Sequence, residues 1–143
     1  SGMFSTNASQ DSIKTRGEPT TLIAEGSKIT GDLIFNGNLE IQGSIVGKII
    51  SDDDNSQVRV LHGGSVLGSV SAPNVIINGH IKGDIFALKH ARLASQAVVE
   101  GNLYYNTLEI ERGAHVAGNL VHELPATNVS VLAQDDISKN SKA

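Results

Sequence analysis

LEIQGSIVGKII, residues 39–50, places an apolar residue or a glycine at every odd position. A two-residue period of this kind is typical of a β-strand with one buried face. Two of the positions on the buried side are glycines, Gly43 and Gly47. Glycine inside a strand leaves nothing to pack, so one uninterrupted strand explains this stretch poorly.

The same pattern recurs along the chain. VIINGHIKGDI (75–85) matches LEIQGSIVGKI (39–49), and a longer version is present as VRVLHGGSVLGSV (58–70) and LEIERGAHVAGNL (108–120). Degenerate copies are LIAEGSKITGDL (22–33) and ARLASQAVVEGNL (91–103). Successive copies start about 16–19 residues apart, and long and short units alternate through most of the core.

This period predicts an all-β fold, a β-helix or solenoid. A spacing of two excludes an amphipathic helix, whose apolar residues recur with a period of 3.6, and a unit of this length holds three short strands joined by bends. Stacked units pair each strand with its counterpart about 4.8 Å away. The glycines then mark corners, where they allow positive φ without crowding. We assign to corners Gly31, Gly43, Gly47, Gly68, Gly79, Gly83, Gly101 and Gly118.

A column of outward residues is expected just after the last glycine of each unit: Asp32, Lys48, Ser69, Asp84, Asn102 and Asn119. Asp32 beside Lys48 would form a favourable pair worth less than about 1 kcal/mol. Asn102 over Asn119 would form a short amide ladder.

Composition and charge narrow the classes of protein that this chain can belong to. The chain has 143 residues, 39% of them hydrophobic and only 3% aromatic, which predicts one aliphatic core. It has no cysteine, which fits a reducing compartment, and its net charge of −4 without a basic run gives no indication of nucleic-acid binding. No apolar run reaches the roughly 20 residues of a membrane span and no leader is recognisable, so we expect a cytoplasmic protein.

Three zones divide the chain. We interpret residues 1–19 as a flexible tail, whose first two residues resemble a remnant of tag cleavage, and residues 20–122 as the solenoid. Residues 123–143 form a second tail. Its mildly apolar stretch NVSVLA (128–133) has two interpretations, an idle tail, which we favour, and a segment that docks on another surface.

The motifs that carry chemistry elsewhere are absent or weak. Asp52, Asp53 and Asp54 lie in SDDDNSQ (51–57), which lacks the glycine and closing glutamate of a calcium loop and predicts a solvated turn. GSIVGKII (43–50) lacks the spacing and the following helix of a phosphate loop. The five histidines, His62, His80, His90, His115 and His122, are interpreted as solvated surface residues. We therefore expect no catalytic site, no metal and no cofactor.

The two ends of the stack are the predicted site of function. End coils expose unpaired backbone groups, which most solenoids cover with caps, and nothing in the sequence resembles a cap. Uncapped ends should stack on one another and propagate a filament. The apolar residues assigned to the N-terminal interface are Leu22, Ile23, Ile29, Ile34 and Phe35, and those assigned to the C-terminal interface are Leu108, Ile110, Val116, Leu120 and Val121.

Residues 20–122 resemble the bactofilins, a family of bacterial cytoskeletal proteins. The resemblance rests on SKITGDL (27–33), IQGSIVGKI (41–49), INGHIKGDI (77–85) and VAGNL (116–120). It implies a right-handed β-helix of about six coils that assembles without nucleotide into filaments without polarity. It also implies scaffolding of cell-shape and cell-wall machinery under the cytoplasmic membrane.

The resemblance also implies attachment to the membrane by insertion of a short apolar N-terminal segment, for which Met3 and Phe4 are the candidates here. Two apolar residues bind weakly, but a filament displays many copies. Two other functions stay open beside the structural polymer. One is a non-polymeric solenoid that binds a partner through one face. The other, less favoured, is a left-handed β-helix acyltransferase, whose six-residue repeat differs from the spacing found here.

Overall fold

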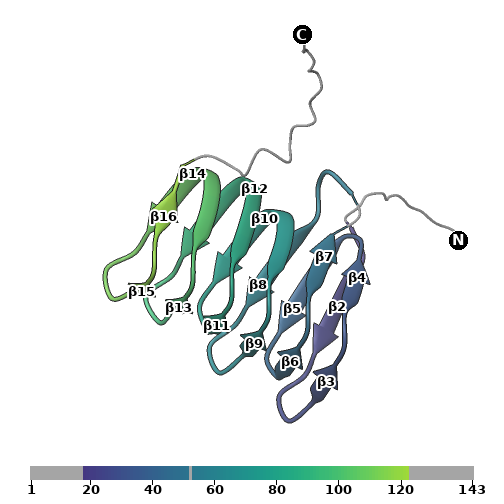
Figure 1. Cartoon of the computed structure of the whole chain (residues 1–143). Helices are drawn as coiled ribbons and strands as arrows, with labels where there is room; N and C mark the ends of the chain where they lie inside the picture. The colour runs from purple at the N-terminus through teal and green to yellow at the C-terminus, as the bar shows by residue number, and fades with distance from the viewer. Residues whose placement is uncertain (1–17, 52, 123–143) are drawn as a thin grey trace, which may run out of the picture.

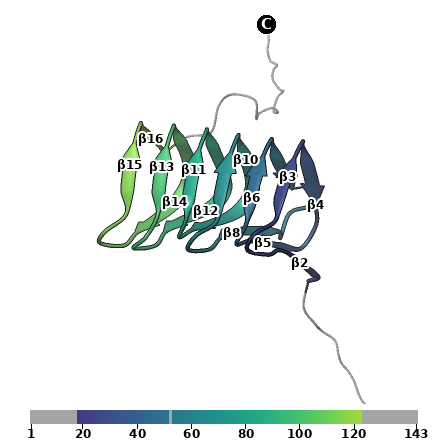
Figure 2. The same cartoon turned by 90° about the horizontal axis from the view of Figure 1, so that it is seen from below.

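The structure is a computed structural model that describes residues 18–51 and 53–122, and these residues form strands and turns without a helix. The strands are β2 Thr20–Ile23, β3 Lys28–Thr30, β4 Leu33–Phe35, β5 Asn38–Ile41, β6 Ser44–Val46, β7 Ile49–Ser51, β8 Gln57–Val60, β9 Ser65–Leu67, β10 Val70–Ile77, β11 His80–Lys82, β12 Ile85–Leu93, β13 Val98–Glu100, β14 Leu103–Ile110, β15 His115–Ala117 and β16 Leu120–Val121. They wind into coils that stack in one row (Figures 1 and 2). The predicted all-β solenoid is confirmed.

Each coil contributes strands at three positions. Every strand pairs in parallel with its counterparts in neighbouring coils, so the solenoid has three faces. The first face contains β2, β5, β8 and the second halves of β10, β12 and β14. The second face contains β3, β6, β9, β11, β13 and β15, one strand for each of six coils. The third face contains β4, β7, the first halves of β10, β12 and β14, and β16.

The interior is built from columns of aliphatic side chains that run along the solenoid axis. On the third face the column is Leu33, Ile49, Val70, Ile85, Leu103 and Leu120. Its four middle members are completely buried. One coil alone cannot enclose such a column, so each coil depends on its neighbours for the burial that stabilises it.

Glycines form the corner between the second and third faces. Gly31, Gly47, Gly68, Gly83, Gly101 and Gly118 occupy the same place in successive coils, and all have φ between 124° and 154°. From Gly47 onward, a Cβ would collide with the carbonyl oxygen of the preceding glycine in the column. Both positive φ and close stacking therefore require glycine here, which confirms the predicted column.

The corner between the first and second faces alternates in length. It has four residues in 24–27, 61–64 and 94–97, two in 42–43 and 78–79, and four again in 111–114. Gly43 and Gly79 lie in the two short corners, and their φ values are not positive. A Cβ on either would approach carbonyl oxygens of the preceding long corner within 2.6 Å. These two glycines thus serve close packing between corners of unequal length.

The third corner carries no glycine column. β10, β12 and β14 run through it as long strands, with register irregularities between Ala72 and Asn74 and between Ala87 and His90. Between β7 and β8 a longer loop replaces the bend, as predicted for SDDDNSQ. Asp53 closes this loop by accepting hydrogen bonds from the N–H groups of Asn55 (2.8 Å) and Gly37 (3.2 Å).

Candidate assembly interface

Both ends of the solenoid carry open strand edges in the described part of the chain. Strands β2 and β3 lie at one edge of their sheets, and β15 and β16 lie at the other. Along the glycine corner, the N–H of each glycine from Gly31 to Gly101 donates to a carbonyl oxygen of the next coil. The first such bond joins the N–H of Gly31 to the oxygen of Val46 (2.8 Å), and the last joins the N–H of Gly101 to the oxygen of Ala117 (3.0 Å). By the same geometry, the N–H of Gly118 faces the open C-terminal end.

The C-terminal end also exposes the core. Ile110 continues the column of Ile77 and Leu93, which are completely buried, yet its side chain is 48% exposed. Leu120, which pairs with the buried Leu103, is 43% exposed. Leu108 and Val116 are partly buried against the same core. These four predicted interface residues end their columns together and form one apolar surface.

The N-terminal end is better covered. Ile23 and Phe35 are buried, and Ile29 and Leu33 are partly buried against the core. Phe35 pairs with Ser51 in the second coil, so a large ring in the first coil is followed by a small polar side chain. With Ile23 and Phe35 buried, the first coil exposes less of its core than the last coil does.

Three of the predicted interface residues project sideways and not toward an end. Leu22 pairs with Glu40, Ile34 with Ile50, and Val121 with Tyr104, and all three lie in columns on the outer surface. Conversely, Leu33 is not among the predicted interface residues, yet it begins the axial column that continues in Ile49. Aligning GDL (31–33) with GKI (47–49) would have identified Leu33.

Polar contacts link successive coils at the glycine corner. Asp32 accepts a hydrogen bond from the backbone N–H of Lys48 (3.0 Å), and Asp84 accepts one from that of Asn102 (3.0 Å). The expected contact between Asp32 and Lys48 therefore uses the main chain of Lys48. The amide of Asn119 donates to the side-chain oxygen of Asn102 (3.1 Å), which confirms the predicted amide ladder.

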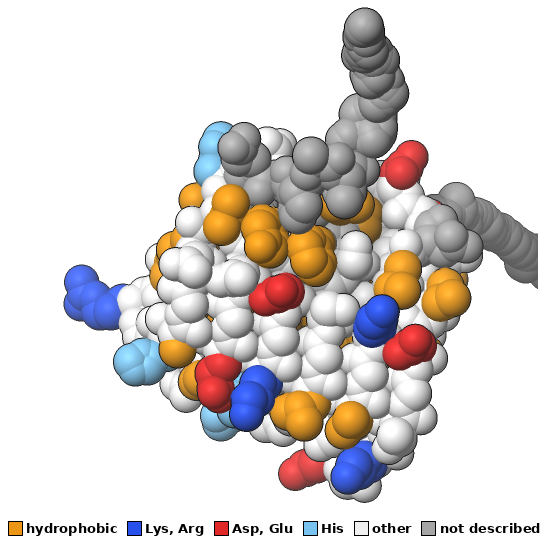
Figure 3. All heavy atoms as spheres, viewed as in Figure 1, with side chains coloured by type: hydrophobic (Ala, Val, Ile, Leu, Met, Phe, Trp, Pro, Cys, Tyr) orange, Lys and Arg blue, Asp and Glu red, His pale blue; other side chains and the backbone are white. Residues whose placement is uncertain are grey.

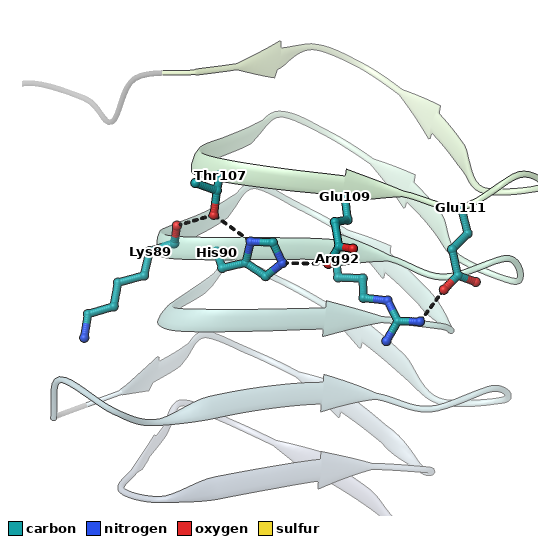
Figure 4. A network of polar contacts seen from close by, with 6 residues as sticks. All are labelled: Lys89, His90, Arg92, Thr107, Glu109 and Glu111. Atoms are coloured by element: carbon teal, nitrogen blue, oxygen red, sulfur yellow. Dashed lines mark hydrogen bonds and ion pairs between the residues drawn. The ribbon is translucent and has the colours of Figure 1, made fainter.

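A network of side chains ties the last coil to the fifth on the first face (Figure 4). His90 contacts the hydroxyl of Thr107 (2.6 Å) and the carboxylate of Glu109 (3.1 Å), and Arg92 pairs with Glu111. Thr107 also donates to the carbonyl oxygen of Lys89 (3.1 Å). The contacts of His90 and Thr107 are exposed, that of Arg92 with Glu111 is partly buried, and each is of modest strength. Together they link the terminal coil to the fifth coil.

The remaining histidines and acidic residues do not converge. His80 pairs with Glu100 (2.5 Å) beside a shallow depression of about 340 Å³ that His62 also lines. No group of three or more His, Cys, Asp or Glu side chains in residues 18–51 and 53–122 is arranged to hold a metal ion. The hydrogen bond from Asn55, followed by that from Gly37, lowers the pKa of Asp53 below its ordinary value. This loop carboxylate thus serves local structure.

The candidates for membrane contact, Met3 and Phe4, lie outside the described residues, as does the stretch 128–133. Within the described residues, there is no helix with the length and hydropathy needed to cross a membrane.

Six stacked coils, an axial aliphatic core and two open ends define a parallel β-solenoid that lacks a cap in its described part. The family model for Bactofilin, described as polymer-forming cytoskeletal, matches residues 21–121. The chain belongs to the bactofilin family, a structural, polymer-forming family and not a family of enzymes. No curated protein and no solved structure matches it.

Proposed function

We propose that this protein assembles end to end into cytoskeletal filaments without nucleotide. The observation that carries the proposal is the abrupt end of the core at Ile110 and Leu120, whose column partners are completely buried one coil earlier. A second subunit stacked on this end would continue the columns and pair the open strand edges. No nucleotide-binding motif was identified in the sequence, which is consistent with assembly that needs none.

The energetics of stacking support a specific contact. Complete burial of a leucine or isoleucine contributes about 1.5–3 kcal/mol, so covering the exposed half of Ile110 or Leu120 contributes about 1 kcal/mol for each. A coil face of this size buries on the order of 1,000 Å² in total, at the low end for specific interfaces. Up to roughly ten backbone hydrogen bonds would add about 0.5–1.5 kcal/mol each. Contacts at two opposite ends propagate a filament.

The filament we propose is non-polar, joined end to like end, and lies in the cytoplasm on the inner face of the cell membrane. There it would scaffold proteins that determine cell shape or remodel the cell wall. Support for these features comes from the family resemblance. The difference between the two ends, one exposing Ile110 and Leu120 and the other with Ile23 and Phe35 buried, fits two distinct kinds of junction.

Paired substitutions test the interface. Ile110→Arg places an unpaired charge where a second subunit would bury the side chain, which is strongly unfavourable. Leu67→Arg is the matched control, because Leu67 has the same exposed fraction of 48% but projects from the outer surface of a middle coil. We expect electron microscopy to show filaments for the parent and for Leu67→Arg, and only monomers or single junctions for Ile110→Arg. Unchanged filaments of Ile110→Arg would exclude the C-terminal coil as an interface.

Membrane attachment requires a separate experiment. Liposome co-sedimentation compares the whole chain with a version lacking residues 3–6, both as filaments. Since a filament multiplies a weak anchor, we expect the shortened version to stay in the supernatant. Equal pelleting of both would contradict a role of Met3 and Phe4. Repeating the comparison with Ile110→Arg separates loss of the anchor from loss of avidity.

A further inference from the structure

A row of hydrophobic side chains runs along the outside of the third face. Successive strands place these residues in register, and we call them the outer stripe: Ile34, Ile50, Ser71, Phe86, Tyr104 and Val121. Figure 3 shows hydrophobic side chains in a row across the upper part of the molecule. Ser71 is the single small polar member of the stripe.

The outer stripe is not part of the core. Ile34 is 67% exposed and Ile50 is 38% exposed, while Phe86 and Tyr104 stack with ring centroids 5.0 Å apart and planes at 3°. The corresponding outer column of the first face contains the charged residues Glu40, Arg59, Arg92 and Glu109. An apolar row on one outer face, interrupted only by Ser71, beside a column on another face in which four of six residues are charged, marks an interaction surface.

The dimensions of the stripe limit what it can hold. Five coil spacings of about 4.8 Å make it about 24 Å long, and it is one side chain wide. Such a strip offers a few hundred Å², well below the roughly 800 Å² that each partner buries in a stable interface between separate molecules. A tethered segment needs far less area, because its effective concentration is on the order of millimolar. The stripe therefore fits an occupant supplied by the same chain.

The chain leaves the solenoid beside this stripe. Val121 is the last member of the stripe, and His122 follows it with its ring 5.5 Å from that of Tyr105. Residue 128 lies seven positions after Val121, a reach of up to about 25 Å, which matches the length of the stripe. Residues 128–133, NVSVLA, carry Val129, Val131 and Leu132.

We propose that residues 128–133 bind the outer stripe of their own subunit and cover it. From the sequence alone we favour an idle tail for these residues. Because an exposed apolar row lies where the chain leaves the solenoid, we now favour a segment that docks. The segment then buries apolar side chains on the outer face of its own subunit, independently of contacts at the ends. This inference does not depend on filament formation.

Cysteine pairs test the contact directly, because the natural chain has no cysteine. The test pair is Ser71→Cys with Ser130→Cys, which joins the middle of the stripe to the middle of the segment. The matched control is Ser65→Cys with Ser130→Cys. Ser65 belongs to the same coil and is also partly exposed, but it lies on the second face. Disulfide formation requires the Cβ atoms to approach within about 4.5 Å, and mass spectrometry measures its rate under mild oxidation.

We expect the test pair to form a disulfide within one chain at least about tenfold faster than the control pair, as a high effective concentration requires. Adding Val131→Asp should reduce the rate of the test pair to that of the control. Equal rates for the two pairs would overturn the proposal. A disulfide that joins two chains, through Ser71→Cys of both or between Ser71→Cys and Ser130→Cys, would overturn it in favour of a second copy as the occupant.

Discussion

Substitution of one corner glycine tests the stacking of the coils. In Gly68→Ala the new Cβ lies within 3.0 Å of the carbonyl oxygen of Gly47, and the residue keeps a φ of 145°. A strained φ costs about 1–3 kcal/mol, and the collision forces two coils apart, so we expect a total loss of about 3–5 kcal/mol. Gly31→Ala is the matched control, because its φ is also positive at 124° but its Cβ meets nothing within 4 Å.

The assay is urea unfolding followed by circular dichroism. Both substitutions are made in the Ile110→Arg chain, which we expect to form no filaments, and at protein concentrations low enough that single junctions do not contribute to the measured stability. The free energy of unfolding should fall by about 2 kcal/mol more for Gly68→Ala than for Gly31→Ala, a difference that reports the collision and not the strained φ. Equal losses for the two variants, or a loss below about 1 kcal/mol for Gly68→Ala, would refute the close stacking of the glycine column.

Three further predictions concern the C-terminal end, the loop and the last coil. Leu120→Arg should abolish filaments in electron micrographs, because Leu120 faces the solenoid axis. Val121→Arg should preserve them, because Val121 faces the outer surface. Equal effects of the two substitutions would contradict this assignment. Asp53→Asn should lower the melting temperature at pH 7, since its two oxygens accept separate hydrogen bonds and the amide retains one acceptor. Because the pKa of Asp53 is lowered from 3.8, its contribution is present above that pH and is lost as the pH falls through the lowered value. The difference from the parent should therefore vanish in strong acid; a difference that grows would be inconsistent with this. His90→Ala should increase amide hydrogen exchange in residues 107–121 and leave the middle coils unchanged, as expected if the contacts with Thr107 and Glu109 hold the last coil.

The coil period and the glycine column were predictable because stacking imposes them on every unit. Gly47, Gly68 and Gly83 recur where positive φ and a close neighbour exclude any side chain. The alternation of long and short units was also visible in the sequence, and the structure assigns it to one corner. Gly43 and Gly79 were correctly placed at corners, but their role there is close packing, which requires the preceding coil to be known.

Side-chain direction at the ends was less predictable. In β4 the sequence LIF (33–35) is apolar throughout, so alternation cannot show which residues face the axis. The structure turns Leu33 and Phe35 inward and Ile34 outward, and the same ambiguity affects Leu120 and Val121. The outer stripe could not be predicted from the sequence, because its members come from different coils and align only through the register.

The axial repeat of the purified polymer tests end-to-end assembly most directly. Six coils at about 4.8 Å each predict a rise of about 29 Å for each subunit. If like ends meet, as proposed, the structure repeats every two subunits, about 58 Å. Electron cryomicroscopy should show strands perpendicular to the filament axis, continuous 4.8 Å spacing across each junction and this repeat. Monomers alone at micromolar concentration, or a subunit rise that leaves a gap in the 4.8 Å spacing, would contradict the account.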